Sequence, residues 1–375
     1  TAGIERLLNS PSFRPKFKVH WAFSLLGAIG CISVMLLINA IATGIAFLFV
    51  IIIFIWLQRR EMEAAWGDVR RGIWMAITRA GLMRMSTETE AKTWRPHPLV
   101  LSGAPTNRWH LIDFASSLTP NRGILTVATV LTDEKIKAER KNSMENNIRD
   151  FLAKRSIQAL VRVTTAPDPF EGSERLIESY GLGALVPNTV ILGDSENEDI
   201  REKYCEMIAS FHRQKRNVLV VHENKELGFG NRKRIDIWWG GLQGNGGLMM
   251  ILAYLLQSSR TWWDTEVRIK MVVHDEKAAE GATANLVRIV DRIRTGAKPE
   301  VLVSNGRNFN EILHESSKEA DLVMLGMAEP NENFIGYYEN IQERLKDLPT
   351  TVLVMAAEGI SFGEVLMQQD TFHED

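Results

Sequence analysis

The order of apolar and polar residues divides the chain into an uncharged front part and a mixed rear part. From Val19 to Gln58, 40 residues contain no Asp, Glu, Lys or Arg, which is enough for two membrane crossings of about 20 residues each. We therefore predict a transmembrane helical hairpin over residues 19–58, with crossings at His20–Ile38 and Ala40–Leu57. A single long helix buried in a water-soluble protein is the alternative. It is disfavoured because soluble cores rarely use so many uncharged residues in a row.

The charges beside this stretch predict its orientation. Basic residues stand on both sides of it, namely Arg14, Lys16, Lys18, Arg59 and Arg60. Because such residues favour the cytoplasmic side of a membrane, both ends of the hairpin, the segment 1–18 and the rear part are predicted to be cytoplasmic. His20 is the one ionisable residue of the stretch, so we expect the hairpin to be scaffold rather than an ion path. The chain opens with Thr1, and we expect it to be part of a longer polypeptide.

An amphipathic connecting helix is predicted over residues 59–90. Its apolar residues recur at alternating spacings of four and three, which is typical of a packing seam. The seam consists of Met62, Trp66, Val69, Ile73, Ala76, Ala80 and Met83. It could couple the membrane part to the rear part or pair with a second copy of the chain. Packing on its own body or on lipid headgroups explains it equally well, because one amphipathic helix does not identify its partner.

From Pro98 onward, β-branched apolar runs alternate with amphipathic segments. We predict strands at Leu99–Ser102, Ile124–Leu131, Ile157–Thr164, Thr189–Leu192, Val218–His222, Arg234–Trp239, Val267–Val273, Glu300–Ser304, Leu322–Leu325 and Thr351–Met355. Helices between them include Ile136–Lys154, Ser195–Arg213, Leu248–Gln257, Ala278–Arg294 and Asn333–Leu348. This alternation predicts an α/β fold with mostly parallel sheets that helices cover on both faces.

An internal repeat predicts two lobes. The stretch Thr189–Gly193 resembles Asp321–Gly326, and each is followed by an acidic helical segment and a final strand. We therefore expect two copies of one doubly wound unit, over residues 94–228 and 229–357, with a tail at 358–375.

Composition and motifs argue against several classes of function. The net charge of −2 and the absence of a basic, aromatic-rich run give no indication of nucleic-acid binding. The two cysteines, Cys31 and Cys205, cannot build a disulfide framework and have no metal-ligand spacing. The sequence also lacks H-E-x-x-H and G-x-S-x-G. We therefore expect neither a metal site nor an enzyme.

Glycines near strand ends are the candidate anion-binding or nucleotide-binding residues. The run Gly240–Gly247 follows a strand and opens a helix, where backbone amides can cradle an anion. Other candidates lie where open α/β sheets bind ligands, at the carboxyl ends of strands. The candidates are Ser102, Gly103, Gly193, Gly244, Gly246 and Gly326. The alternative, that these glycines merely permit tight turns, is the more common case, and no cofactor is predicted.

Four separated stretches resemble the cation-chloride cotransporters. They are Ser10–Phe17, Trp94–Pro96 leading into Leu99–Gly103, Gly181–Thr189, and Ile235–Trp239 followed by Gly246–Leu248. Their order and spread identify the chain as similar to the last two membrane helices plus the C-terminal cytosolic domain of a prokaryotic member. The resemblance implies an integral protein of the inner or plasma membrane that moves Cl⁻ together with K⁺, or with Na⁺ and K⁺.

The same resemblance implies the role of this part of the transporter. Its cytosolic lobes would be similar to universal stress proteins, support a homodimer, and contact membrane lipid and the rest of the transmembrane domain. The ion sites would lie in a LeuT-like core outside this chain, which would serve assembly and regulation. Stress-protein lobes that bind ATP carry G-x-x-G, but Glu196 and Glu329 stand three residues after Gly193 and Gly326. Neither lobe keeps the pattern, which argues against ATP binding in the usual mode. The alternative function is a membrane-tethered nucleotide sensor built on stress-protein-like lobes.

Overall fold

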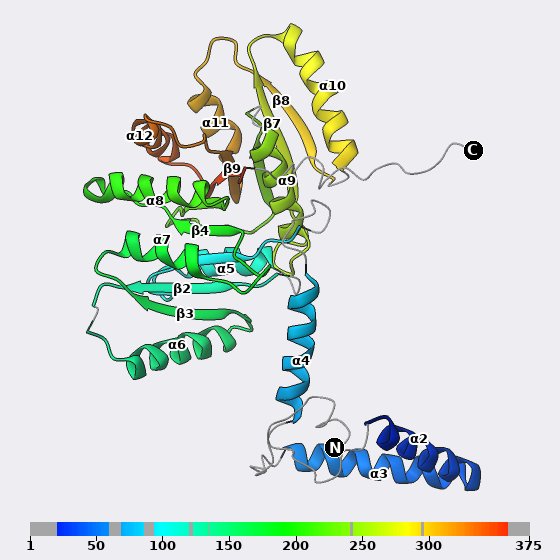
Figure 1. Ribbon diagram of the computed structural model, residues 1–375. Coiled ribbons are helices and arrows are strands. Elements are labelled where there is room, and N and C mark those ends of the chain that lie inside the picture. Colours follow the sequence, from blue (N-terminus) through cyan, green and yellow to red (C-terminus); the bar gives the residue numbers. More distant parts are fainter. Residues whose placement is uncertain are drawn as a thin grey trace. The chain divides into compact units, whose positions relative to one another are not determined.

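The computed structural model describes residues 21–59, 69–85, 94–119, 123–133, 135–240, 243–293 and 296–358 (Figure 1). The chain forms two compact units, Thr1–Ser86 and Thr87–Asp375, which we describe separately. The predicted segments 1–18 and 358–375 lie outside the described residues, apart from residue 358.

The front unit contains a pair of contacting apolar helices, α2 (Trp21–Ile38) and α3 (Ala40–Arg59). Asn39 separates them, and its Oδ1 accepts a hydrogen bond from the Ala42 amide at 3.0 Å. The Thr43 hydroxyl donates to the carbonyls of Met35 and Asn39, each at 2.8 Å. Most described apolar side chains of both helices are exposed. Within the described residues, no helix combines the length and the hydropathy required of a membrane span, so the predicted crossings are not confirmed.

The connecting helix is represented by α4 (Val69–Arg84). Of the predicted seam, Met62 and Trp66 lie outside the described residues, and Val69 is the first residue of α4. Ile73 is half-buried, whereas three members of the seam are exposed, namely Ala76, Ala80 and Met83. Among the four seam residues whose burial is described, these three are therefore open to a partner.

The rear unit is built on one ten-stranded sheet with the order β3-β2-β1-β4-β5-β10-β9-β6-β7-β8. The strands are β1 (Pro98–Leu101), β2 (Thr126–Leu131), β3 (Leu160–Thr165), β4 (Thr189–Gly193), β5 (Asn217–His222), β6 (Arg234–Trp238), β7 (Glu266–Val273), β8 (Lys298–Val303), β9 (Leu322–Gly326) and β10 (Thr351–Met355). Strands β1–β5 and strands β6–β10 follow the same internal order, so the sheet consists of two similar halves. The predicted α/β fold with a mostly parallel sheet is confirmed, and the lobe limits 94–228 and 229–357 stay a prediction.

Helices cover both faces of this sheet because alternate strand residues point to opposite sides. One face packs on α5 (Trp109–Leu118), α6 (Ala138–Ala153), α9 (Gln243–Gln257) and α10 (Glu276–Ile293). The other face packs on α7 (Pro169–Ser179), α8 (Arg201–Arg213), α11 (Phe309–Ser317) and α12 (Phe334–Leu345). A short 3₁₀ helix, η2 (Glu198–Ile200), precedes α8. Val100 lies in the first core and its neighbour Leu99 in the second, as a pleated strand requires.

The two halves join through β5 and β10, which pair antiparallel, whereas the other pairings of the sheet are parallel. Val220 lies opposite Leu353 at the centre of this junction. The fully buried Asn217 reinforces it, because its Oδ1 accepts from the Ala357 amide at 2.8 Å and its Nδ2 donates to the Asn188 carbonyl at 3.1 Å. The carboxyl ends of the strands therefore point to opposite edges of the sheet in the two halves.

Strands β3 and β8 are the outer strands of the sheet. On β3, the Val163 amide donates to Glu145 Oε1 at 2.9 Å. On β8, Pro299 lacks an amide hydrogen. Both outer strands thus expose fewer unpaired backbone donors than an ordinary edge.

Candidate functional site

Each half of the sheet has a pocket at the carboxyl ends of its strands, the position at which open α/β sheets bind ligands. The first-half pocket has a volume of about 210 Å³, and the second-half pocket has a volume of about 290 Å³. The polar and glycine residues that line the first are Gly103, Arg108, Ser173, Gly193, Ser195 and Tyr204. Those that line the second include Gly240, Asn245, Gly326 and Arg344. The two pockets occupy equivalent positions in the two halves but lie at opposite edges of the sheet.

The structure brings some of the predicted glycines together. Gly103 and Gly193 line the first-half pocket, and Gly103 has a positive φ of 60°, which favours glycine. Gly326 lines the second-half pocket. Ser102 is fully buried beside the first-half pocket and its hydroxyl has no hydrogen-bond partner among the described residues.

The glycine run before α9 has a packing role. Gly244 and Gly246 belong to the first turn of α9 and do not line the second-half pocket. A Cβ atom on Gly246 would lie 2.5 Å from the Trp239 ring. Glycine at this position therefore lets the indole pack directly on the helix, and this contact accounts for Gly246 without an anion.

Sequence reasoning missed the polar residues of these pockets. Arg344 Nε donates to Asn310 Oδ1 at 2.9 Å, and the guanidinium lies 5.2 Å from the Phe309 ring centroid. Asn245 uses both ends of its amide, because Nδ2 donates to the Met327 carbonyl and Oδ1 accepts from the Ala356 amide, each at 2.8 Å. No motif marks these residues, and only the folded strand order brings them to the edge.

The size of the two pockets limits what they can hold. Small-molecule sites usually enclose about 300–1,000 Å³, and both volumes fall below that range. One arginine in each pocket can balance a single negative charge. The geometry therefore favours a small inorganic anion over a whole nucleotide, and nucleotide binding stays a prediction.

A buried polar cluster connects the two halves at the carboxyl end of β4. Asp194 Oδ2 lies 2.7 Å from His222 Nδ1, and its Oδ1 accepts from Tyr338 Oη and from Gln342 Nε2, each at 2.6 Å. His222 belongs to β5, whereas Tyr338 and Gln342 belong to α12 of the second half. One carboxylate thus fixes a helix of the second half to the strand ends of the first.

The environment of Asp194 keeps it ionised. Burial raises its pKa, but hydrogen bonds from His222, Tyr338 and Gln342 more than offset that effect, so its pKa lies below the usual aspartate value. Burial is also the largest cause that raises the pKa of the neighbouring Tyr204 and Tyr338 hydroxyls, which stay protonated at neutral pH. These groups form a structural contact and contain no activated nucleophile.

The buried Cys205 thiol is also not activated as a nucleophile. Burial raises the pKa of the Cys205 thiol to about 11, so the nucleophilic thiolate is scarce at neutral pH. Among the residues that the structure describes, no three His, Cys, Asp or Glu side chains are placed to hold a metal ion.

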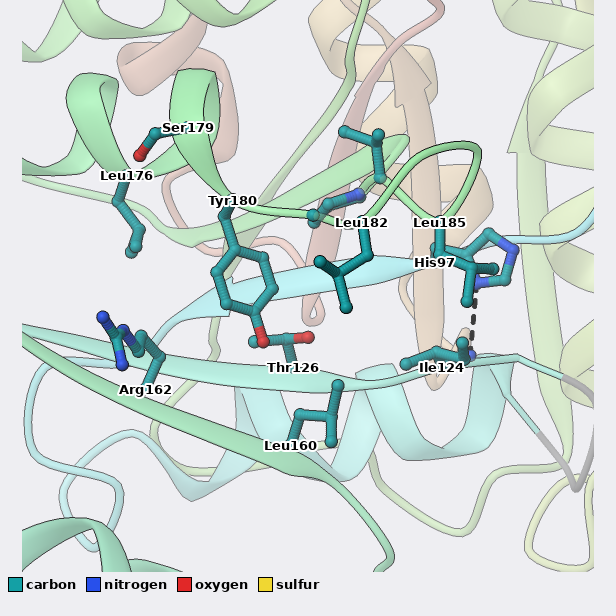
Figure 2. Close-up of a pocket in the computed structure, with 13 residues that line it drawn as sticks. His97, Ile124, Thr126, Leu160, Arg162, Leu176, Ser179, Tyr180, Leu182 and Leu185 are labelled. Carbon is teal, nitrogen blue, oxygen red and sulfur yellow. Dashed lines mark hydrogen bonds between the residues drawn. The ribbon is translucent and has the colours of Figure 1, made fainter. Parts of the chain in front are cut away.

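A third cavity, the amino-end pocket, lies at the amino ends of β1, β2 and β3 (Figure 2). It encloses about 370 Å³, which is within the range of small-molecule sites. Loop residues 180–187 border it, and they include most of the stretch Gly181–Thr189 that resembles the cotransporters. Leu160 and Leu182 expose large apolar side chains here. The sequence does not predict this pocket, because ligand sites of open α/β sheets are expected at the opposite strand ends.

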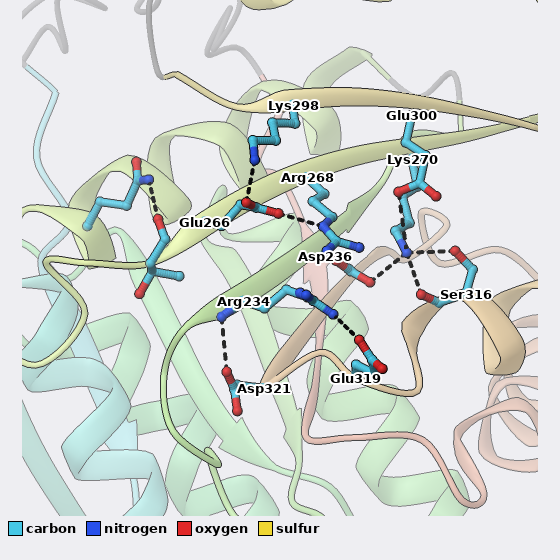
Figure 3. Close-up of polar contacts among 12 residues, drawn as sticks. Arg234, Asp236, Glu266, Arg268, Lys270, Lys298, Glu300, Ser316, Glu319 and Asp321 are labelled. Carbon is cyan, nitrogen blue, oxygen red and sulfur yellow. Dashed lines mark hydrogen bonds and ion pairs between the residues drawn. The ribbon is translucent and has the colours of Figure 1, made fainter.

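A charged network crosses β6, β7 and β8 on one face of the second half (Figure 3). At its centre, Lys270 Nζ lies 2.9 Å from Asp236 Oδ2, and both side chains are 0% exposed. Lys270 also donates to the Ser316 carbonyl and hydroxyl oxygens at 2.5 and 2.6 Å. Neither Asp236 oxygen has a hydrogen bond of good geometry within the described structure, so its charge is balanced mainly by Lys270. The pair lies away from the pockets, since neither residue lines them.

Comparison with known proteins identifies the family. The model of the family "Solute carrier family 12" matches residues 108–230 and 195–308, which together cover more than half of the chain. The chain belongs to solute carrier family 12. This result confirms the resemblance to the cation-chloride cotransporters that four separated stretches suggested.

Several solved structures are similar to the rear unit in fold. The cytoplasmic domain of a prokaryotic cation chloride cotransporter is 19% identical with a TM-score of 0.54, over 72% of this chain and 100% of that one. At this low identity, the likeness concerns the fold alone. A universal stress protein from Archaeoglobus fulgidus DSM 4304 is 11% identical over 70% of this chain and 98% of that one, with a TM-score of 0.46. A putative universal stress protein from Pseudomonas aeruginosa UCBPP-PA14 is 8% identical over 74% and 99%, with a TM-score of 0.47. The last two likenesses are too weak to argue from.

The buried ion pair leads to a stability prediction. Lys270→Met leaves the Asp236 charge buried and unpaired, so we expect the free energy of unfolding to fall by about 3–5 kcal/mol. The double variant Lys270→Met with Asp236→Leu removes both charges and should recover most of this loss. Urea unfolding measures both effects, and Lys346→Met, which removes an exposed ion pair with Glu343, serves as the control with a change under about 1 kcal/mol. Equal losses in the single and double variants would contradict this account.

The lowered pKa of Asp194 leads to a pH prediction. A carboxyl whose pKa is lower in the folded state stabilises the fold above the unfolded pKa of about 4. That stability is lost as the pH falls through the folded value. We therefore expect Asp194→Asn to lower the free energy of unfolding by about 1–3 kcal/mol at pH 6, with a smaller difference from the wild type at pH 3. Exposed Asp291 provides the control, since Asp291→Asn should change stability by less than about 0.5 kcal/mol at either pH.

Proposed function

We propose that this chain is the cytosolic regulatory and dimer-forming portion, with an adjoining membrane hairpin, of a secondary transporter for Cl⁻ together with K⁺, or with Na⁺ and K⁺. The observation that carries the proposal is the solute carrier family 12 match over residues 108–308, behind a 40-residue uncharged stretch. The solved relative of similar fold is named as the cytoplasmic domain of a cation chloride cotransporter. The ion specificity is carried over from that name and from the resemblance in sequence.

A regulatory role fits the rear unit better than ion conduction does. Its sheet is covered on both faces by helices that form two packed cores. The two carboxyl-end pockets and the amino-end pocket share no lining residue. We therefore place the ion-binding sites outside this chain and assign assembly and regulation to the rear unit.

We also propose that α2 and α3 lie in a membrane. Together they expose a long series of apolar side chains, including Leu37, Ile41 and Phe47, whose contact with water is unfavourable. The break between the helices satisfies its own backbone, because Asn39 and Thr43 bond to it internally. Such internal satisfaction is what a lipid environment demands.

Cys31 allows this placement to be tested. It is a free, exposed cysteine of α2, whereas Cys205 is buried. In the full chain reconstituted into liposomes, we expect a membrane-impermeant maleimide to label Cys31 only after SDS is added. The variant Ser143→Cys, on the exposed face of α6, should label without SDS when its side of the bilayer is accessible. Rapid labelling of Cys31 in intact liposomes would show that α2 lies in water.

Transport is tested on the complete transporter that carries this chain. In liposomes, we expect uptake of radioactive Rb⁺, a K⁺ substitute, that falls to the level of empty liposomes when gluconate replaces Cl⁻. Replacing external Na⁺ by N-methylglucamine then shows whether Na⁺ takes part. Rb⁺ uptake that is unchanged in gluconate would rule out coupling to Cl⁻.

The proposed homodimer has two candidate contact surfaces. On α4, the described seam residues Ala76, Ala80 and Met83 are exposed. In the second half of the rear unit, Tyr254 and Trp263 are exposed, with Trp263 reaching 74%. Exposed aromatic side chains are enriched at protein interfaces, and a helix seam of this spacing pairs with a second helix.

Substitution on the seam tests the dimer. We expect Ile73→Asp with Ala80→Asp to weaken dimerisation at least tenfold, because a charge buried in the contact is costly. Mass photometry and light scattering of the full chain in detergent measure the effect. Thr78→Asp introduces one negative charge on α4 outside the seam and should leave the dimer intact, whereas either seam substitution alone should weaken it. A monomeric wild type at tens of micromolar would exclude the proposed dimer.

A further inference from the structure

The amino-end pocket is held open by a fixed loop (Figure 2). Leu182 and Leu185 exchange two backbone hydrogen bonds of 3.0 Å, which close residues 182–185 into a tight turn. Gly181 enters this turn at φ 142°, and a Cβ there would lie 2.9 Å from the Leu185 carbonyl oxygen. The turn that borders the pocket therefore depends on glycine at position 181.

One end of the pocket is apolar. Leu160 is the first residue of β3, and Leu182 and Leu185 project from the loop toward the sheet in Figure 2. Leu182 is 69% exposed although an apolar cavity lies directly beneath it. Such a surface can bury the hydrocarbon part of a ligand, and each buried methylene group contributes about 0.8 kcal/mol.

The other end carries polar groups that lack partners. Thr126 is 2% exposed, and its hydroxyl has no hydrogen bond among the described residues. The Tyr180 hydroxyl points toward it in Figure 2 and likewise has no partner within the described part of the chain. Because both residues line the pocket and their hydroxyls are not bonded within the described chain, a ligand could accept hydrogen bonds from both without breaking a contact inside the protein.

Charge at this end favours an anion. Arg162 lines the pocket, its side chain is 56% exposed, and its nearest carboxylate, Glu145, is 4.0 Å away. Burial lowers the pKa of His97, so His97 is neutral at pH 7 and adds no charge. No Asp or Glu is present in the described lining of the pocket. Arg162 thus brings a cation to the same pocket that Thr126 and Tyr180 line.

We propose that the amino-end pocket binds an amphipathic carboxylate, of the class of medium-chain fatty acids. Its carboxylate pairs with Arg162 and accepts hydrogen bonds from Tyr180 and Thr126. Its hydrocarbon tail packs against three leucines, namely Leu160, Leu182 and Leu185. A single arginine matches one negative charge, which favours a carboxylate over a nucleotide with several phosphate charges. The site is separate from the two carboxyl-end pockets. Through it, the rear unit would bind an amphiphilic ligand.

The experiment uses a diazirine-bearing octanoate and the full chain in lipid nanodiscs, with crosslinks located by peptide mass spectrometry. Octanoate is sufficiently water-soluble for competition against the lipid phase. We expect crosslinks within residues 157–165 and 176–187, and we expect unlabelled octanoate to compete them away. Acetate lacks the tail and octanol lacks the charge, so each should compete at least tenfold more weakly.

Matched variants distinguish the proposed contacts from general effects. Arg162→Gln should weaken octanoate competition at least tenfold, whereas Arg149→Gln, on exposed α6, should leave it unchanged. Thr126→Val preserves the shape of the side chain and should weaken competition about threefold or more. Leu182→Asn should also weaken it, with Leu227→Asn as the exposed-leucine control.

Three results would overturn the proposal. If octanol competes as strongly as octanoate, the carboxylate does not contribute to binding, and the proposed contact with Arg162 is wrong. Crosslinks that persist unchanged in Arg162→Gln would also contradict the contact between the carboxylate and Arg162. Labelling confined to residues 21–59 would show that the probe only partitions into lipid. Protection of residues 180–187 from hydrogen exchange on addition of octanoate provides an independent readout, and its absence at saturating crosslinking would also contradict the assignment.

Discussion

The antiparallel pairing of β5 with β10 is the contact on which the rest of the rear unit depends. It joins two similar five-stranded halves into one sheet, and it requires their strands to run in opposite directions. The helices next to the junction then meet in pairs, α5 with α9 on one face and α8 with α12 on the other. Asn217 fixes the end of β10, and Asp194 fixes α12 to the strand ends of the first half. Loss of this pairing would separate the two halves and divide both cores, because each core contains residues of both halves.

This opposite direction also explains the distribution of the pockets. The carboxyl-end pockets of the two halves face opposite edges of the sheet, so one ligand cannot contact both. The amino-end pocket of the first half lies at the same sheet edge as the carboxyl-end pocket of the second. The carboxyl-end pockets each contain one arginine, whereas the larger amino-end pocket is lined mainly by apolar side chains, so the three pockets differ in chemistry as well as in position.

The sequence predicted the elements better than the sites, for physical reasons. Continuous apolar runs such as Val218–His222 identify buried parallel strands directly, and the repeat around Gly193 and Gly326 indicated two similar halves. The pair Asp236 and Lys270 was not predicted, because charges in a strand usually mark a solvated face and only the alignment of β6 with β7 brings these two together. Gly246 was a candidate for anion binding, but its neighbour Trp239 needs the space. The amino-end pocket depends on a three-dimensional turn at Leu182 and on unpartnered hydroxyls, which no local pattern encodes.

The outer strands have a consequence for the chain at high local concentration. A sheet with two exposed edge strands can pair with the edge strands of other copies at both sides. A membrane would hold many copies in similar orientation, which would promote this edge-to-edge pairing. Glu145 occupies the Val163 amide on β3, and Pro299 interrupts the row of donors on β8. These two small features oppose fusion of neighbouring copies into a continuous filament, while leaving the helical surfaces free to associate in a defined and finite way.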